Sequence, residues 1–253
     1  MITAEDPTSL QGLRVVIAGG TTGIGRATAV RLVREGARVL IFGRSEAHLN
    51  DAIADVTAQI AGGGEVHGIV GDNAEYADVA RAFATADTKL GGIDAFVGVA
   101  GVAVGGVAET EPEAMEYAVR ANVTGYLYDA HEALKRMKPQ GRGQMVFIGS
   151  LSAVGLEAGG DIYTATKAAN QAFVASFRKG VNKDGIRVSL VEPGLIGTDL
   201  QNDATPPEKQ REMIADDLML KAEDVAAAVL YILSQPSRSH VTDLRIRPTK
   251  QEG

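Results

Sequence analysis

A tyrosine and a lysine stand four positions apart in the stretch "DIYTATKAAN", residues 161–170. Residues at positions i and i+4 share one face of an α-helix, so Tyr163 and Lys167 can point into the same space. Only small residues lie between them, which leaves room for a ligand. A phenol beside an ammonium can act as a general acid or base, because the positive charge favours the phenolate and lowers the tyrosine pKa from about 10. The alternative is a surface helix whose Tyr and Lys meet no ligand.

A glycine-rich loop near the start of the chain predicts a phosphate site. The apolar run 14–18 leads into "AGGTTGIGRA" and then directly into a helical pattern. Gly19, Gly23 and Gly25 let backbone amides approach a ligand because no Cβ stands in the way. The N-terminus of the following helix attracts a phosphate. The spacing G-x-x-x-G-x-G differs from the dinucleotide fingerprint G-x-G-x-x-G, but its position after the first strand favours nucleotide binding over an ordinary turn.

The elements that must position these residues alternate along the chain. Continuous apolar strands between helices indicate an α/β fold of the doubly wound Rossmann type, a parallel sheet with helices on both faces that binds ligands beyond the carboxyl ends of its strands. We predict one domain over residues 1–253, with strands at 14–18, 38–42, 65–70, 95–99, 144–148, 187–191 and 243–246. The predicted helices are 24–35, 46–61, 75–90, 112–137, 162–180 and 222–234.

One connection is longer than the others. Residues 198–220 lie between the sixth strand and the last long helix and contain Pro206 and Pro207. Long segments of this kind are often lids. We therefore expect a substrate lid that is mobile without substrate and becomes ordered when cofactor and substrate bind.

The composition narrows the classes of function. The net charge of −7 argues against a general nucleic-acid or anionic-membrane surface. The absence of cysteine excludes disulfides, thiol nucleophiles and cysteine-ligated zinc. The four histidines are scattered without metal-ligand spacing, so we expect no metal site.

The location of the protein is predicted from its start and from its most apolar run. The first residues carry Glu5 and Asp6 and lack both a basic start and an apolar run, so no secretory signal is predicted. The run 95–108 contains four glycines and is too short to cross a bilayer. We expect a cytoplasmic protein without a membrane partner.

The order of several motifs resembles the short-chain dehydrogenase/reductase family over nearly the whole chain. The glycine loop is similar to the family pattern T-G-x-x-x-G-x-G, with Ala18 in place of the threonine. Ser150, Tyr163 and Lys167 match the pattern S-x12-Y-x3-K, and Asn122 in "ANVTG" matches the family's active-site asparagine. The resemblance implies an oxidoreductase that exchanges a hydride between a nicotinamide and a carbonyl or alcohol group.

The resemblance also implies how these four residues would act. Tyr163 is expected to be the general acid or base, its pKa lowered by Lys167 and by an oxidised nicotinamide. Lys167 would also hold the nicotinamide ribose, and Ser150 would bind the substrate oxygen. Asn122 would hold a water that passes protons to Lys167. Ser152 competes with Ser150 for the serine role, and the interval to Tyr163 favours Ser150.

The second strand indicates which dinucleotide is bound. Enzymes for NAD place a carboxylate there for the ribose hydroxyls, whereas this chain has Gly43, Arg44 and Ser45. A guanidinium attracts a 2′-phosphate and can bind it through two hydrogen bonds, so we predict NADP(H). Arg44 as a plain solvated charge is the alternative. The predicted cofactor contacts are Gly19, Thr21, Thr22, Gly23, Ile24, Gly25, Arg44, Ser45, Asp72, Asn73, Ala100, Gly101, Tyr163, Lys167, Pro193, Gly194, Ile196 and Thr198.

Two features depart from the family pattern. Gly98 and Val99 replace both asparagines of the motif N-N-A-G after the fourth strand, which affects the geometry expected there. The ending "IRPTKQEG" is similar to a branch of broad-specificity carbonyl reductases that end in R-P-T-x-Q.

Three functions are compatible with these motifs. The leading one is an NADP(H)-dependent carbonyl reductase or alcohol dehydrogenase acting on a small molecule. A 3-oxoacyl-carrier-protein reductase would need a basic patch, which Lys135, Arg136, Lys138 and Arg142 could supply. A catalytically idle NADP-binding sensor ranks last, because Tyr163 and Lys167 are both present. By resemblance we expect a homodimer or homotetramer.

Overall fold

The computed structural model describes residues 9–156, 159–202 and 204–251, so Glu5, Asp6 and Asp203 lie outside the described residues. Within it, seven parallel strands form one sheet in the order β3-β2-β1-β4-β5-β6-β9. This arrangement confirms the predicted doubly wound, Rossmann-type α/β fold. The strands are β1 (Arg14–Ala18), β2 (Arg38–Gly43), β3 (Glu65–Val70), β4 (Ala95–Gly98), β5 (Gly143–Ile148), β6 (Ile186–Pro193) and β9 (Asp243–Ile246).

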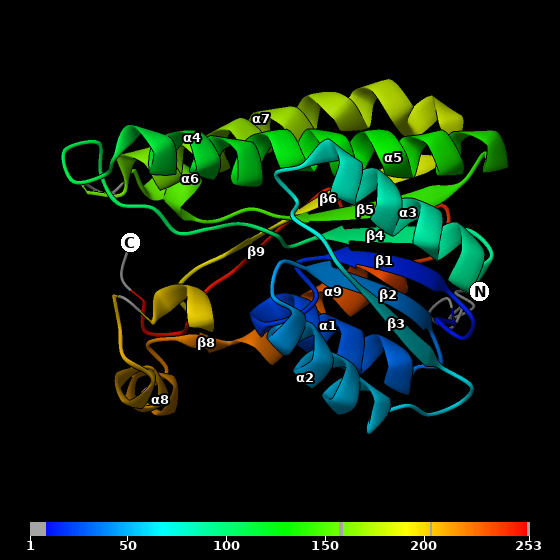
Figure 1. Cartoon of the computed structure of the whole chain (residues 1–253), viewed down its shortest axis with the longest axis horizontal. Helices are drawn as coiled ribbons and strands as arrows, with labels where there is room; N and C mark the ends of the chain where they lie inside the picture. The colour runs from blue at the N-terminus through cyan, green and yellow to red at the C-terminus, as the bar shows by residue number, and fades with distance from the viewer. Residues whose placement is uncertain (1–8, 157–158, 203, 252–253) are drawn as a thin grey trace, which may run out of the picture.

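Helices cover both faces of the sheet (Figure 1). The side chains of α3 (Tyr76–Leu90), α5 (Gly125–Gln140) and α7 (Asp161–Val181) pack on one face. On the opposite face lie α1 (Gly23–Arg34), α2 (Glu46–Thr57) and α9 (Ala222–Leu233). Each parallel strand is therefore enclosed on both sides, which explains why the strands read as continuous apolar runs rather than as alternating ones.

Phenylalanine rings link the sheet to α3 and α7, the helices that lie above it in Figure 1. Phe96 on β4 lies between Phe83 of α3 and Phe147 of β5, with ring centroids 5.6 Å apart in each pair. Phe147 in turn meets Phe173 of α7 edge-on at 5.8 Å. These contacts fix α7 against the sheet, and α7 carries Tyr163 and Lys167.

The predicted helix 112–137 contains a π turn. The structure has α4 (Pro112–Val119), a π-helical turn (Arg120–Thr124) and then α5. Asn122 lies in that turn, where its backbone carbonyl accepts a hydrogen bond of 2.8 Å from the side chain of Asn170. Such a π turn widens the helix locally and often marks a functional position. The chain therefore stays helical over 112–140, as predicted, and the sequence did not indicate the π turn within it.

The expected lid folds into short elements. It contains a 3₁₀ turn (Asp199–Gln201), α8 (Pro207–Ala215) and the start of β8 (Leu220–Lys221), which pairs with β7 (Ile196–Gly197). The amide of Gln210 on α8 is buried and bonds Asn202 and the carbonyl of Thr205. Asp203 is the residue of this segment outside the described part. That the segment moves on binding stays a prediction.

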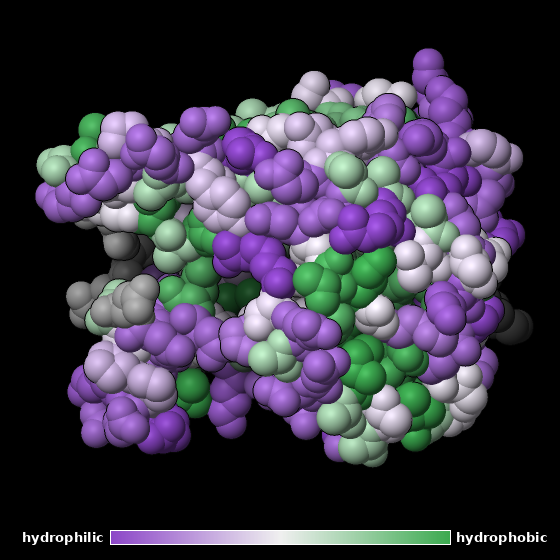
Figure 2. Space-filling view, in the orientation of Figure 1, coloured by the Kyte–Doolittle hydropathy of each residue, from purple (hydrophilic) through white to green (hydrophobic). Residues whose placement is uncertain are grey.

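Figure 2 shows where apolar side chains reach the surface. They gather over the edge strand β3, where Val66 and Ile69 are half-buried and Val70 is exposed. In the left half of the same view the surface is hollowed above α8. Across the residues that the structure describes, no helix has both the length and the apolar character that crossing a membrane requires.

Candidate active site

A cavity of about 920 Å³ runs along the carboxyl ends of the strands. This is the position at which doubly wound sheets bind ligands, because the loops on either side of the central strand separate there. Asn122 and Gly25 do not line it. All the other predicted site residues do: Gly19, Thr21, Thr22, Gly23, Ile24, Arg44, Ser45, Asp72, Asn73, Ala100, Gly101, Ser150, Tyr163, Lys167, Pro193, Gly194, Ile196 and Thr198.

Ser150, Tyr163 and Lys167 converge at one end of this cavity. Ser150 follows β5. It is held near the end of β6 because the backbone amide of Leu151, the next residue, donates to the carbonyl of Pro193 at 3.0 Å. Tyr163 and Lys167 share a face of α7, with the lysine Nζ 5.6 Å from the centre of the tyrosine ring. The structure therefore brings together the three side chains of the predicted S-x12-Y-x3-K pattern.

The pKa of Tyr163 differs in direction from the expectation. Burial raises the pKa of Tyr163, and a side-chain hydrogen bond with Ser150 acts in the opposite direction. Lys167 was expected to lower this pKa, but its ammonium points to a backbone carbonyl. Within the chain, burial therefore dominates and holds the phenol in its protonated form, the form that can donate a proton.

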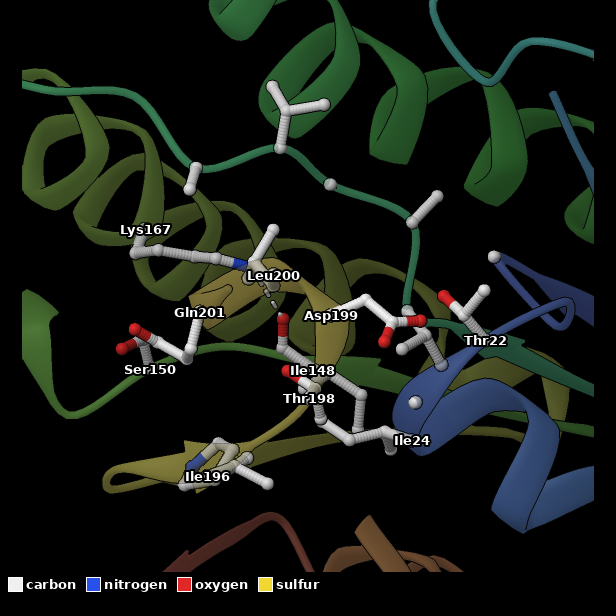
Figure 3. A pocket seen from close by; sticks show the side chains of 18 of the residues that line it. Thr22, Ile24, Ile148, Ser150, Lys167, Ile196, Thr198, Asp199, Leu200 and Gln201 are labelled. Carbon is white, nitrogen blue, oxygen red and sulfur yellow. Dashed lines mark hydrogen bonds between the residues drawn. The ribbon is translucent and has the colours of Figure 1, made fainter. Parts of the chain in front are cut away.

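Lys167 is almost completely buried, with 4% of its surface exposed. Its Nζ donates to the carbonyl of Ile148 at 3.1 Å, and Figure 3 shows the side chain reaching from α7 to that oxygen. The Tyr126 hydroxyl donates to the same carbonyl at 2.9 Å. Burial lowers the pKa of Lys167 to about 8, because removal from water penalises the charged form.

Asn122 supports the site from outside the cavity. Its side chain exchanges two hydrogen bonds with the backbone of Val102, accepting at 2.8 Å and donating at 3.0 Å. It also donates to the Thr166 hydroxyl at 3.2 Å. Asn122 therefore ties the loop after β4 to α7, one residue before Lys167. Its expected role in holding a water stays a prediction.

Ser152 lies beside Ser150 and also lines the cavity. The Ser150 hydroxyl donates to the Ser152 hydroxyl at 3.0 Å, and the Ser152 amide donates back to Ser150 at 3.1 Å. Of the two serines, it is Ser150 that acts on the pKa of the Tyr163 phenol, lowering it against the effect of burial. The preference for Ser150 that the spacing gave stays a prediction.

The glycine loop leaves space for a ligand and for a close helix. A Cβ on Gly19, whose φ is +74°, would stand 2.7 Å from the backbone of Ala100. A Cβ on Gly25 would stand 2.1 Å from the Gly19 carbonyl, so Gly25 lets α1 pack against the loop. Gly25 was predicted as a cofactor contact, and the structure places it against the loop rather than in the cavity.

The side-chain amide of Asn73 lies against Gly125 and Asp129 of α5. Asn73 lines the cavity and is 5% exposed. Both its Nδ2 and its Oδ1 lack a geometrically aligned hydrogen-bond partner among the described residues. The glycine loop and the elongated cavity fit a dinucleotide lying across the strand ends.

A chain of hydrogen bonds crosses the far end of the cavity from Ser150. The Arg44 guanidinium donates from Nη1 to the Tyr117 hydroxyl at 2.6 Å, and that hydroxyl donates to Asp72 Oδ2 at 2.9 Å. Arg44 also lies over the Tyr117 ring, 5.5 Å from its centre. Tyr117 was missed by the sequence reasoning, although it lies on a predicted helix five residues before Asn122.

The packing around Gly98 explains why this chain lacks the asparagines that the family has after the fourth strand. A Cβ on Gly98 would stand 2.9 Å from the Phe147 ring and 3.0 Å from the Phe96 ring. The Tyr126 hydroxyl lies 3.1 Å from the carbonyl of Gly98 and shares its single proton between that oxygen and the Ile148 carbonyl. Aromatic rings therefore fill the place next to this strand end, and Val99 lines the cavity in its usual position after the strand.

Several other residues line the cavity although no sequence motif indicates them. His48 projects from the first turn of α2, and Leu200 and Gln201 come from the 3₁₀ turn of the segment after β7 (Figure 3). Arg245 and Arg247 reach the cavity because β9 pairs beside β6, with Glu192 opposite Arg245. The pairing of the last strand, rather than any local pattern, places them there.

The chain matches the profile of a known family. The profile "short chain dehydrogenase" matches residues 14–209. An uncharacterised oxidoreductase of Staphylococcus haemolyticus (strain JCSC1435) is 29% identical over 242 residues, covering 95% of this chain and 99% of the relative. Another from Staphylococcus aureus (strain MRSA252) is 29% identical over 234 residues, covering 92% and 96%.

Solved structures agree with this match. A short-chain type dehydrogenase/reductase from Mycobacterium ulcerans is similar with a TM-score of 0.86 and 27% identity, covering 95% of this chain and 90% of that chain. Levodione reductase gives a TM-score of 0.84 and 27% identity, covering 93% and 96%. The similarity extends over the sheet and the strand ends that form the cavity.

Proposed function

The chain belongs to the short-chain dehydrogenase family, and we propose that it is an NADP(H)-dependent oxidoreductase that reduces a ketone or aldehyde to an alcohol, or catalyses the reverse reaction. The observation that carries the proposal is the convergence of Ser150, Tyr163 and Lys167 at one end of a dinucleotide-sized cavity. The levodione reductase relative supports the assignment to the carbonyl reductase branch.

The chain's own residues account for the proton and for the polarised oxygen. When bound, the nicotinamide supplies or accepts the hydride. Tyr163 donates its phenolic proton to the substrate oxygen during reduction, and burial keeps that proton in place beforehand. Ser150, which lines the same end of the cavity, would offer its hydroxyl to the same oxygen and stabilise the charge that develops there.

Lys167 and Asn122 complete the proposed site. The Lys167 ammonium, fixed at the Ile148 carbonyl, would hold the nicotinamide ribose and return a proton toward Tyr163. With a pKa of about 8, Lys167 can gain and lose a proton near neutral pH. Asn122 holds the loop after β4 against the turn of α7 that carries Lys167.

The preference for NADP(H) is proposed from Arg44. This exposed guanidinium lines the cavity after β2, where a carboxylate would select the ribose hydroxyls of NAD. Ser45 caps α2 by accepting the His48 amide at 3.3 Å, so the positive end of that helix lies beside Arg44. Both features favour an added phosphate.

Arg44→Ala is expected to weaken NADPH binding by about ten- to a hundredfold, the loss of a charge-assisted hydrogen bond, and to leave NADH binding nearly unchanged. Titration of both cofactors, followed by fluorescence, measures the two dissociation constants. Arg34→Ala, an exposed arginine on α1 outside the cavity, is the matched control. Equal losses for both cofactors, or a native preference for NADH, would overturn the NADP(H) assignment.

The two neighbouring serines can be separated by substitution. Ser150→Ala is expected to lower kcat by about a hundredfold, as for removal of one donor to a developing oxyanion, with little change in cofactor affinity. Ser152→Ala should cost tenfold or less, because its hydroxyl contacts Ser150 rather than the phenol. Steady-state kinetics at saturating cofactor measures kcat for both variants and shows which serine contributes more. A larger loss in the Ser152 variant would transfer the role to Ser152 and leave the reductase proposal standing.

The structure does not favour a carrier-protein reductase. The basic residues that could recognise an acidic carrier already face carboxylates: Lys135 and Arg136 pair with Glu132, Lys138 with Asp184, and Arg142 with Asp94. Salt bridges with the chain's own acids leave little net positive field for a partner. We therefore keep a small-molecule carbonyl or alcohol as the proposed substrate.

The function is tested by following nicotinamide absorbance with NADPH and NADH against a panel of ketones, aldehydes and 3-oxoacyl thioesters. Oxidation of NADPH by a small ketone or aldehyde supports the proposal. Turnover of the thioesters alone would favour the carrier-linked alternative, and no turnover despite NADPH binding would favour the sensor. A homodimer or homotetramer also stays a proposal, supported by the exposed side chains of Val119 on α4 and Leu127 on α5.

A further inference from the structure

Tyr117 joins the two sides of the cavity end that holds Arg44. It is a half-buried side chain on α4, whereas Arg44 follows β2 and Asp72 follows β3. All three line the cavity. Three separate segments therefore meet through one phenolic hydroxyl, which accepts from Arg44 at 2.6 Å and donates to Asp72 at 2.9 Å.

The directions of these two hydrogen bonds are fixed by the chemistry of the groups. A guanidinium only donates and a carboxylate only accepts, so the hydroxyl between them must accept from one and donate to the other. Burial and the Asp72 hydrogen bond raise the pKa of Tyr117 against the lowering effect of Arg44. The phenol therefore keeps the proton with which it holds Asp72.

We propose that Tyr117 is a positioning residue that determines cofactor preference by holding Arg44 ready for the 2′-phosphate. The inference rests on the proposed NADP(H) function. An exposed arginine samples many rotamers, and fixing them on binding costs affinity. The hydroxyl and the ring of Tyr117 restrict Arg44 beforehand. Within the described part of the chain only one of the five guanidinium N–H groups is used, so the others can bind a phosphate.

Tyr117 also keeps opposite charges apart. Its hydroxyl lies between the guanidinium and the Asp72 carboxylate, so the positive charge of Arg44 is not consumed by a direct ion pair. Asp72 in turn is held by the Tyr117 hydroxyl and by the Ala74 amide at 2.9 Å. Loss of the hydroxyl would free Arg44 to reorient, and this would affect a ligand with a 2′-phosphate more than one without it.

The test compares two cofactor fragments that differ only in that phosphate, adenosine 2′,5′-bisphosphate and adenosine 5′-monophosphate. Calorimetry should show that Tyr117→Phe weakens the bisphosphate by about three- to tenfold, the loss of one hydrogen bond, and barely changes the monophosphate. Tyr128→Phe, a half-buried tyrosine outside the cavity, should change neither. KM for NADPH should rise while kcat stays unchanged.

A double-mutant cycle shows whether Tyr117 acts through Arg44. If it does, adding Tyr117→Phe to Arg44→Ala costs no further bisphosphate affinity. Additive losses, or an unchanged fragment ratio in Tyr117→Phe, would overturn this inference and leave the NADP(H) proposal intact. A wild-type protein that binds both fragments equally would instead overturn the NADP(H) proposal together with this inference.

Discussion

Tyr163→Phe is expected to lower kcat by at least about 10²–10⁴-fold, the range for loss of a general acid or base. The change removes only the hydroxyl, so the ring keeps its packing on α7. NADPH affinity should change little, because the phenol serves the proton transfer. The burial that raises the Tyr163 pKa also predicts that the native enzyme holds this proton at neutral pH, ready for reduction.

Steady-state kinetics on the best carbonyl substrate, together with NADPH titration, measures both quantities. Tyr231→Phe removes the hydroxyl of an exposed tyrosine on α9 outside the cavity and should leave kcat unchanged. Retention of most of the native kcat by Tyr163→Phe would show that the proposed mechanism is wrong, whatever the cofactor.

Lys167→Met should make the protein inactive and more stable at neutral pH. We expect kcat to fall by about a hundredfold or more and NADPH binding to weaken, because the ammonium supports the proton transfer and holds the ribose. The Ile148 carbonyl keeps its hydrogen bond from Tyr126 in the variant, so no buried acceptor loses its last partner. The methionine side chain has a similar length and needs no water.

The stability gain has a definite pH dependence. The Lys167 pKa is lowered from 10.5 to about 8 in the fold, so below pH 8 the buried ammonium is charged in both states and lowers the free energy of unfolding by roughly 3 kcal/mol. Between pH 8 and 10.5 the folded protein loses this proton first, and the native chain gains stability as pH rises. The Tm difference between Lys167→Met and the native chain should therefore be largest near pH 7 and shrink toward pH 10.

Thermal unfolding at both pH values checks this expectation, with Lys179→Met, an exposed lysine on the same helix, as the control. A variant less stable than the native chain at pH 7, or a Tm difference that does not depend on pH, would contradict the buried-charge account. Undiminished turnover would remove Lys167 from the mechanism altogether.

The order of the elements and the chemistry of the strand ends were determined by the sequence. Apolar runs such as Arg14–Ala18 and Ile186–Pro193 form strands because both of their faces are covered, and this leaves a continuous pattern in the chain. The i,i+4 spacing of Tyr163 and Lys167 puts both on one helix face, since helix geometry is local. Parallel order then brings the loops after the strands to one edge of the sheet.

Only the tertiary structure decided what surrounds those residues. Partners from distant segments determine three features: the π turn at Arg120–Thr124, the direction of the Tyr163 pKa shift, and the bridge from Arg44 through Tyr117 to Asp72. Burial and hydrogen bonding act through space, with energies set by which groups meet, and a local pattern does not contain that information. Periodicity therefore located the candidate site, whereas packing determined its charges and its contacts.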